Sequence, residues 1–118
     1  MNPFDYSLCC QTVTVYRKNG EEITRQVADN CHLSREINTP TESYGKSVEK
    51  TFLLIIPGDT VLLQPGDRIF AGVGPEEVNW EQWIPALVPD LFEISYLRPY
   101  CWAGEITHWE AGNGKGAL

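Results

Sequence analysis

Basic side chains are scarce in this 118-residue chain. Nine lysines and arginines stand against sixteen aspartates and glutamates, and the formal net charge at pH 7 is −7. Binding to a nucleic-acid backbone depends on clustered Lys and Arg, which displace counterions from the phosphates. The charge balance therefore argues against general nucleic-acid binding. The segment 76–97 has no basic residue at all, and we interpret it as a solvated surface or as a face that meets a basic partner.

Long apolar runs are also missing. No stretch approaches the roughly 18 apolar residues that a membrane-spanning helix needs. The first residues, Met1–Asp5, carry neither the basic nor the apolar part of a secretory signal. We therefore expect no membrane association and a protein that stays in the compartment where it is made.

Catalytic motifs are equally absent. The sequence contains no Gly-x-Ser-x-Gly, phosphate-binding loop or dinucleotide fingerprint, and its two histidines, His32 and His108, lie in no recognisable catalytic pattern. Asp59 and Asp67 form the best carboxylate pair, but both follow Pro-Gly in turns, where aspartate is used to bind the backbone. The sequence thus predicts a protein that is not an enzyme and needs no cofactor.

The four cysteines lack the spacing of a metal site. Structural zinc sites usually place two ligands two to four residues apart, and this chain has no Cys-x-x-Cys or His-x-x-x-His. We therefore favour buried free thiols over zinc. The weaker alternative is a zinc site assembled from Cys9 or Cys10 together with Cys31, His32, Cys101 and His108.

One turn sequence, Pro-Gly-Asp, occurs twice in the chain. Pro57-Gly58-Asp59 recurs eight residues later as Pro65-Gly66-Asp67. Proline fixes φ at the second position of a turn, and glycine accepts the positive φ that the third position of a type II turn requires. The flanking segments 51–56, 61–63 and 68–73 are short and β-branched, so they predict strands in an all-β domain.

Hydrophobic alternation predicts further strands at 11–17, 22–28 and 31–37. Asn19-Gly20 is typical of a two-residue hairpin, and Asp29-Asn30 suggests a second turn. Segment 38–47 is polar and predicts a long exposed loop, whereas Phe52–Ile56 is apolar throughout and predicts a strand covered on both faces.

The last third of the chain predicts one helix and one hairpin. Residues 76–84 open with two acids after a proline and end before another proline, which favours a short helix that plugs a barrel end. Residues 91–110 read as a hairpin that turns around 99–103.

Together these segments predict one domain, 1–118, with an N-terminal arm at 1–10, a β core at 11–110 that carries the exposed loop 38–47, and a C-terminal tail at 111–118. The expected fold is all-β: a small antiparallel β-barrel or sandwich of about six to eight short strands, with one short helix near residues 76–84.

Four tryptophans suggest one possible binding function. Aromatic side chains stack against sugars in carbohydrate-binding β modules, and the candidates here are Trp80, Trp83, Trp102 and Trp109 together with Tyr96 and Tyr100. Rings at this density equally serve as core residues or interface anchors. A carbohydrate-binding module therefore stands as an alternative of another class.

Several stretches resemble small proteins encoded in the head-and-connector gene clusters of tailed phages and prophages of Gram-positive bacteria. The resemblance lies in the opening Asn2–Tyr6 with Thr12–Tyr16, in Phe52–Asp59, in Gln64–Pro75 and in Phe92–Trp102. It covers most of the chain, and its motifs are those of a fold and not of a catalytic site.

This resemblance implies a structural virion protein of the head–tail connector, of the stopper or head-completion type. Such a protein would form a ring with copies of itself, dock below the portal or adaptor, join the tail, and let packaged DNA pass without sequence-specific binding. It would reside at the head–tail interface of the virion, after assembly in the host cytoplasm. Tail-terminator and minor capsid roles remain alternatives. No small-molecule substrate is implied.

The resemblance carries no residue-level site, so the interaction candidates come from the sequence itself. They are exposed polar or aromatic residues of the arm, of the polar loop and of the predicted helix: Phe4, Tyr6, Thr39, Glu42, Tyr44, Lys46, Glu76, Glu77, Trp80 and Trp83.

Overall fold

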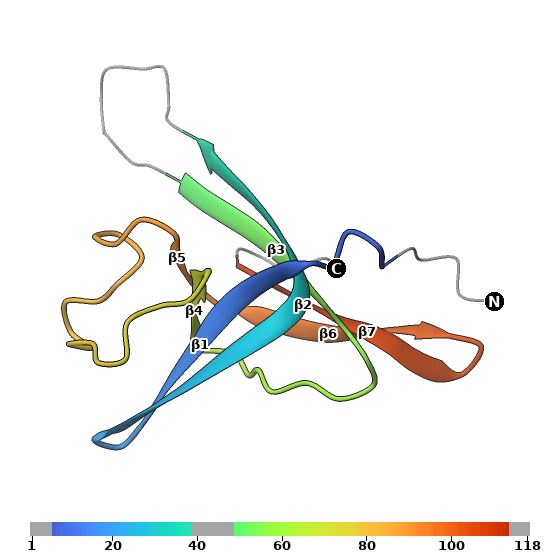
Figure 1. Cartoon of the computed structure of the whole chain (residues 1–118), viewed down its shortest axis with the longest axis horizontal. Coiled ribbons are helices and arrows are strands. Elements are labelled where there is room, and N and C mark those ends of the chain that lie inside the picture. Colours follow the sequence, from blue (N-terminus) through green and yellow to red (C-terminus); the bar gives the residue numbers. More distant parts are fainter. Residues whose placement is uncertain (1–5, 39–48, 114–118) are drawn as a thin grey trace.

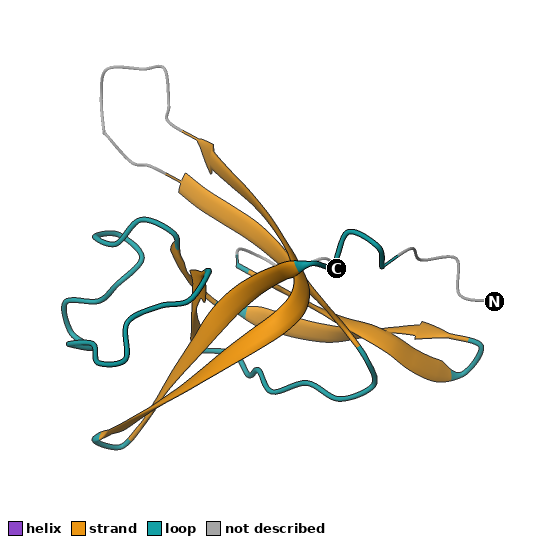
Figure 2. Ribbon diagram, in the orientation of Figure 1, coloured by secondary structure: helices purple, strands orange, loops and turns teal. Residues whose placement is uncertain are grey.

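The chain folds into one curled antiparallel sheet that forms an open half-barrel (Figures 1 and 2). The computed structural model describes residues 6–38 and 49–113. Within these residues seven strands occur and no helix. The predicted all-β fold is therefore confirmed, and no membrane-spanning helix is found in the described ranges.

The spatial order of the strands is β5-β4-β1-β2-β3-β7-β6, and every neighbouring pair is antiparallel. Their bounds are β1 Gln11–Asn19, β2 Glu22–Asn38, β3 Glu49–Pro57, β4 Arg68–Ala71, β5 Leu91–Glu93, β6 Tyr96–Trp102 and β7 Glu105–Gly112.

Strand β2 holds the two halves of the sheet together. Its first half pairs with β1 and its second half with β3. The turn predicted at Asp29-Asn30 is wrong, because the chain bends there without reversing. Asn30 has φ of 60°, a left-handed conformation that asparagine tolerates, and the β1–β2 register shifts between Gln11 and Val13. The bulge lets one long strand pass from one half of the sheet to the other.

The β1–β2 and β6–β7 hairpins end in two-residue turns. In the β1–β2 hairpin Asn19 pairs with Glu22, so the predicted hairpin is confirmed, but its turn lies one residue later, at Gly20 and Glu21, where Gly20 has φ of 68°. In the β6–β7 hairpin Trp102 pairs with Glu105 across Ala103 and Gly104, both with positive φ. The turn predicted around 99–103 therefore lies later, since β6 continues through Pro99 to Trp102.

The C-terminal boundary of the β core also differs from the prediction. Strand β7 continues to Gly112, and Ala111 is buried in the core, so these two residues do not belong to a tail. The remaining residues of the predicted tail from 114 onward lie outside the described residues.

The core lies on the concave side of the half-barrel, where apolar residues from nearly every strand meet. The fully apolar segment of β3 contributes to it as predicted: Phe52, Leu54 and Ile55 are buried, and Leu53 and Ile56 are half-buried. The predicted strand at 61–63 is wrong, since these residues form an irregular segment that still delivers Leu63 to the core. The core cluster consists of Val13, Val15, Cys31, Leu33, Phe52, Leu54, Leu63, Ile69, Phe92, Ile94 and Ala111.

The helix predicted near residues 76–84 is wrong. The segment 72–90, the outer loop, contains only isolated turns, in which Asn79 accepts hydrogen bonds from the amides of Gln82 and Trp83, and Ile84 from those of Leu87 and Val88. The side chain of Asn79 also accepts from the Glu81 amide at 3.2 Å. Asparagine competes in this way with helical hydrogen bonding, and Pro85 stops propagation.

The outer loop covers the convex face of β1 and β4 instead of plugging a barrel end. Thr14 of β1 donates to the Gly72 carbonyl and accepts from the Gly74 amide, both at 2.8 Å. A Cβ atom at Gly74 would lie 2.3 Å from the Tyr16 hydroxyl, so this close approach requires glycine.

Candidate functional site

The ten interaction candidates divide into three groups. Phe4, Thr39, Glu42, Tyr44 and Lys46 lie outside the described residues. Tyr6 lies against β7, while Glu76, Glu77, Trp80 and Trp83 all belong to the outer loop. The described candidates thus occupy two separate places on the molecule.

Trp83 anchors the outer loop to the sheet. Its ring lies edge-on to Tyr16 of β1, with 4.3 Å between centroids, and stacks on Phe70 of β4 at 5.8 Å. The Tyr16 hydroxyl donates to the Pro75 carbonyl. Burial of this hydroxyl raises the pKa of Tyr16, although Arg25 partly offsets the effect. Trp83 is therefore a packing residue of this chain.

Trp80 is held by Arg68, a residue that the sequence reasoning missed. The Arg68 guanidinium carbon lies 3.7 Å from the centroid of the Trp80 ring. One guanidinium nitrogen, Nη1, donates to the carbonyls of Trp80 and Trp83, both at 2.7 Å. Burial lowers the pKa of Arg68, and Glu93, whose Oε1 lies 3.8 Å from Nε, opposes this shift. The Arg68 guanidinium thus donates to two backbone carbonyls, of Trp80 and Trp83, that would accept hydrogen bonds from backbone amides if this segment were a helix.

Glu76 and Glu77 border an open hollow of about 380 Å³ between the outer loop and the β1–β2 hairpin. Its other lining residues are Glu21, Ile23, Arg25 and Val78. Arg25 donates to the carbonyls of Gly74 and Pro75 at 2.7 and 3.1 Å, so its charge fastens the loop to the hairpin. The rim of the hollow is acidic, because Glu21, Glu76 and Glu77 line it and are exposed to solvent.

Tyr6 enters a partly buried polar network on β6 and β7. Its hydroxyl lies 2.7 Å from Nδ1 of His108, which is fully buried. His108 Nε2 lies 3.0 Å from Oε2 of Glu110, and Arg98 donates to the other oxygen of Glu110 at 3.1 Å. The Tyr100 ring stacks on the His108 ring, with centroids 4.6 Å apart. No sequence pattern marks this network, because Tyr6 and His108 are 102 positions apart.

The charge state of Glu110 follows from its partners. Burial by itself would raise the pKa of Glu110, but the hydrogen bonds from His108 and Arg98 outweigh burial and lower it. The carboxylate is therefore ionised at neutral pH and can only accept hydrogen bonds. In the neutral imidazole, the nitrogen that faces Glu110 carries the proton, and Nδ1 accepts from Tyr6.

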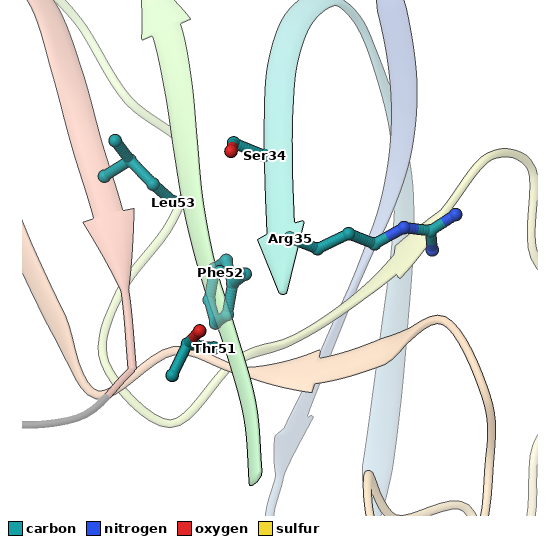
Figure 3. A pocket seen from close by; sticks show the side chains of 5 residues that line it. All are labelled: Ser34, Arg35, Thr51, Phe52 and Leu53. Atoms are coloured by element: carbon teal, nitrogen blue, oxygen red, sulfur yellow. The ribbon is translucent and has the colours of Figure 1, made fainter. Parts of the chain in front are cut away.

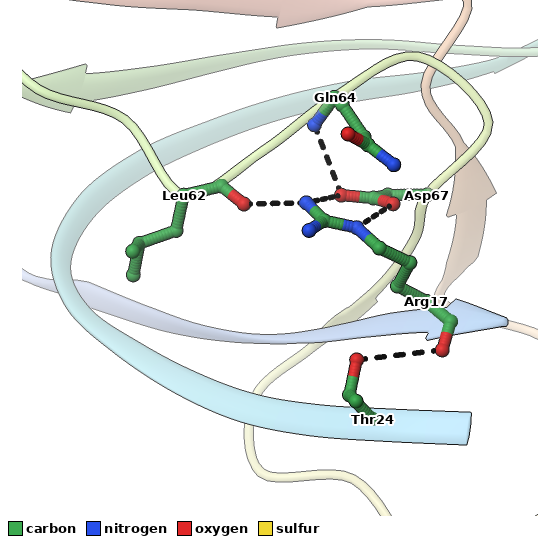
Figure 4. Close-up of polar contacts among 5 residues, drawn as sticks. All are labelled: Arg17, Thr24, Leu62, Gln64 and Asp67. Carbon is green, nitrogen blue, oxygen red and sulfur yellow. Dashed lines mark hydrogen bonds and ion pairs between the residues drawn. The ribbon is translucent and has the colours of Figure 1, made fainter. Parts of the chain in front are cut away.

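The two Pro-Gly-Asp turns have different roles. Asp67 is buried and binds Arg17 through both carboxylate oxygens at 2.8 Å, while Oδ2 also accepts from the Gln64 amide (Figure 4). Arg17 donates further to the Leu62 carbonyl. Asp59, by contrast, is exposed. The structural use predicted for Asp67 is confirmed, and its partner Arg17 was not predicted.

Two further hollows are lined by described residues of the sheet and its loops. The first, about 220 Å³, is lined by Ser34, Arg35, Thr51, Phe52 and Leu53, and Figure 3 shows the Arg35 side chain extending away from the others. The guanidinium of Arg35 pairs with Asp90. The second is a largely apolar groove of about 330 Å³, lined by Val15, Ala28, Asp29, Ile56, Thr60, Leu62 and Leu63.

The cysteines are free thiols in the structure, but only Cys31 is buried. Cys10 and Cys101 are exposed and Cys9 is intermediate, so the prediction of buried thiols is right for one of the four. Burial, with smaller effects from Cys9 and Asp29, raises the pKa of Cys31 to about 11. Over the ranges 6–38 and 49–113, no group of three or more His, Cys, Asp or Glu side chains is placed to hold a metal ion.

The site geometry consists of packing anchors, an acidic rim and a partly buried hydrogen-bond network. Comparison of the chain with protein-family models, with curated proteins and with solved structures finds no match.

Proposed function

We propose that this chain is a structural virion protein of a tailed phage or prophage, a ring subunit of the head–tail connector. The proposal starts from the sequence resemblance. The observation that carries it furthest is the extended shape of the domain, with two-stranded ribbons that reach beyond the core. In the proposed ring these ribbons contact neighbouring copies, the portal or adaptor above, and the tail below.

The strand pairing defines the two ribbons. Strand β4 pairs with β1 only at Val13–Tyr16, so the β1–β2 hairpin projects beyond its neighbours. Strand β3 pairs with β7 only from His108 onward, so the β6–β7 hairpin projects at the opposite side of the molecule (Figure 1). The radius of gyration is 15.2 Å, against roughly 13 Å for a compact domain of this size. Such ribbons suit a subunit that contacts several neighbours.

The surface chemistry also suits this role. The outer loop carries exposed Glu76, Glu77 and Glu81 and half-buried Asp90. Facing a channel, such a surface would repel the phosphate backbone and let DNA pass without adhering. Tail-terminator and minor capsid roles use the same features and stay as variants of the proposal.

Carbohydrate binding receives less support from the same geometry. Trp83 and Trp80 are engaged by Tyr16, Phe70 and Arg68, and the Trp109 indole donates to the Asp59 carbonyl at 3.2 Å. Trp102 is the one tryptophan of the chain that is exposed by more than a third, at 41%. A single exposed ring at a hairpin tip is better suited to a protein contact than to a sugar platform.

The test is deletion of the gene from the phage or prophage that carries it, followed by induction and electron microscopy of the particles. We expect heads that have lost their DNA, beside unattached tails. Full heads beside separate tails would shift the proposal to tail joining. Normal infectious particles would overturn it, and a saturable change of tryptophan fluorescence with added glycans would then favour the carbohydrate-binding module.

A further inference from the structure

The tip of the β1–β2 hairpin carries one of the two Asn-Gly sequences of this chain, Asn19-Gly20. We infer that Asn19 is a site of spontaneous covalent modification, at which its side-chain amide is lost as ammonia and replaced by a carboxylate. Water is the only co-reactant. The reaction depends on the chemistry of this turn alone, and not on the connector role proposed above.

The reaction joins Asn19 to its own neighbour. The amide nitrogen of Gly20 loses its proton to base and attacks Cγ, the side-chain carbonyl carbon of Asn19. A C–N bond forms, the bond from Cγ to Nδ2 breaks, and Nδ2 takes up a proton and leaves as ammonia. The five-membered succinimide ring that remains is opened by water at either of its two C–N bonds. The products are aspartate and isoaspartate, and in isoaspartate the main chain runs through Cβ and Cγ.

The turn leaves both reacting groups accessible. Glycine obstructs the attack least, because it has no Cβ beside the attacking nitrogen. The last pair of the hairpin is Asn19 with Glu22, so Gly20 lies in the turn, and both Asn19 and Gly20 are exposed to solvent. No hydrogen bond from the Asn19 side chain to another residue of the described ranges holds its amide in place. Base and water therefore reach the site directly.

The hairpin tip can open without disturbing the sheet. Beyond Tyr16, β1 no longer pairs with β4 and is flanked only by β2. Two-stranded ribbons are marginally stable, and their last pairs open at low free energy. Ring closure requires the Asn19 backbone to leave its extended conformation, so this pair has to open first. The ion pair between Arg17 and Asp67 holds the strand two residues earlier and confines the opening to the tip.

The second Asn-Gly sequence, Asn113-Gly114, provides an internal comparison. Asn113 is half-buried, and its Oδ1 accepts a hydrogen bond from the Phe52 amide at 3.2 Å. This bond fastens the reacting group itself to β3 and has to break before Cγ can turn toward the next amide. The same dipeptide is thus protected at one end of the sheet and unprotected at the other.

The modification changes the hairpin tip in two ways. Either product adds a carboxylate directly before Gly20, Glu21 and Glu22, and Glu21 already lines the acidic hollow with Glu76 and Glu77. Isoaspartate also inserts one extra atom into the main chain, which the present pairing of Asn19 with Glu22 does not accommodate. A modified molecule therefore differs in charge and in pairing at the end of this ribbon.

The experiment incubates the full chain at neutral pH, in one folded and one urea-unfolded sample, and follows both sites by peptide mapping with mass spectrometry. Replacement of NH₂ by OH raises the mass of a peptide, and electron-transfer fragmentation separates aspartate from isoaspartate. In the folded chain we expect Asn19 to react about tenfold faster than Asn113, because a hydrogen bond holds the side chain of Asn113. In the unfolded chain the two rates should differ by less than about twofold.

The matched variant is Asn19→Gln. Its longer side chain would have to close a six-membered ring, which forms far more slowly, so the mass increase at position 19 should disappear while that at Asn113 stays. An Asn19 that remains unmodified in the folded chain but reacts in the unfolded chain would overturn the inference. Equal rates at Asn19 and Asn113 in the folded chain would overturn it as well, because the hairpin tip would then have no special reactivity.

Discussion

At the scale of single residues, the two Pro-Gly-Asp turns provide a matched pair for mutation. Asp67 is buried and binds Arg17 and the Gln64 amide, whereas Asp59 is exposed. We expect Asp67→Ala to lower the free energy of unfolding by about 2 kcal/mol, a value reduced because Arg17 is partly exposed. Asp59→Ala should change it by less than about 0.5 kcal/mol. Urea unfolding measures both, and equal effects would contradict the distinction.

The ionisation of Glu110 predicts a pH dependence. Because its pKa is lowered in the folded chain, Glu110 adds stability above its unfolded pKa, and this contribution disappears as the pH falls through the folded pKa. The difference in unfolding free energy between wild type and Glu110→Gln should therefore be largest near neutral pH, at about 1–2 kcal/mol. It should shrink as the pH falls below about 4.5, the ordinary pKa of a glutamate side chain.

Urea unfolding between pH 3 and 7 measures this difference, with Glu105→Gln as the control. Glu105 lies on the same strand but is exposed at the hairpin tip, so its substitution should leave a small and nearly constant difference. A Glu110→Gln difference that stays constant over the whole pH range would show that charge is not what Glu110 contributes.

At the scale of elements, the outer loop depends on Arg68. Lysine at this position keeps the charge but loses the planar group that lies over Trp80 while donating to two carbonyls. We expect Arg68→Lys to speed hydrogen exchange about tenfold at the amides of Gln82, Trp83, Leu87 and Val88, which close the turns of the loop. Exchange in β2 and β3 should stay unchanged.

Arg35→Lys is the control for this experiment. Arg35 also pairs with a residue of the outer loop, Asp90, but both side chains are more than 40% exposed. Exposed ion pairs contribute little to stability, so this variant should exchange like the wild type. Uniform acceleration across the sheet in Arg68→Lys would mean that the loop does not open as a separate unit.

The elements that the sequence predicted correctly are those fixed by neighbouring residues. Asn19-Gly20 marks a hairpin, although the turn itself is Gly20-Glu21. Pro65-Gly66 marks a turn in which Gly66 has φ of 95°, and the apolar run of β3 forms a strand whose residues are all buried or half-buried. The predicted helix at 76–84 does not form, because contacts with residues distant in the sequence outweigh the local helix signals. Trp83 packs on Tyr16 and Phe70, and Arg68 takes the carbonyls that a helix would use internally. The hydrogen-bond network of Tyr6, His108 and Glu110 escaped prediction for the same reason, since its members come from both ends of the chain.

At the scale of the whole molecule, the half-barrel stays open and leaves two sheet edges, β5 and β6. Open edges invite pairing with other chains, and natural proteins protect them with short strands or proline. Strand β5 has only three residues, and β6 carries the exposed Pro99 in its middle. Both edges are thus protected against the addition of a strand from another chain.

This protection predicts the effect of removing the proline. Pro99→Thr restores an amide donor and a β-branched side chain on the free edge of β6, so we expect concentration-dependent association through added strands. Analytical ultracentrifugation should show a larger share of oligomers than in the wild type at the same concentration. Pro89→Thr, an exposed proline of the outer loop, is the control and should sediment like the wild type. If Pro99→Thr also remains unchanged, the edge is protected by the twist and short reach of the projecting hairpin, and proline is not the feature that keeps assembly away from it.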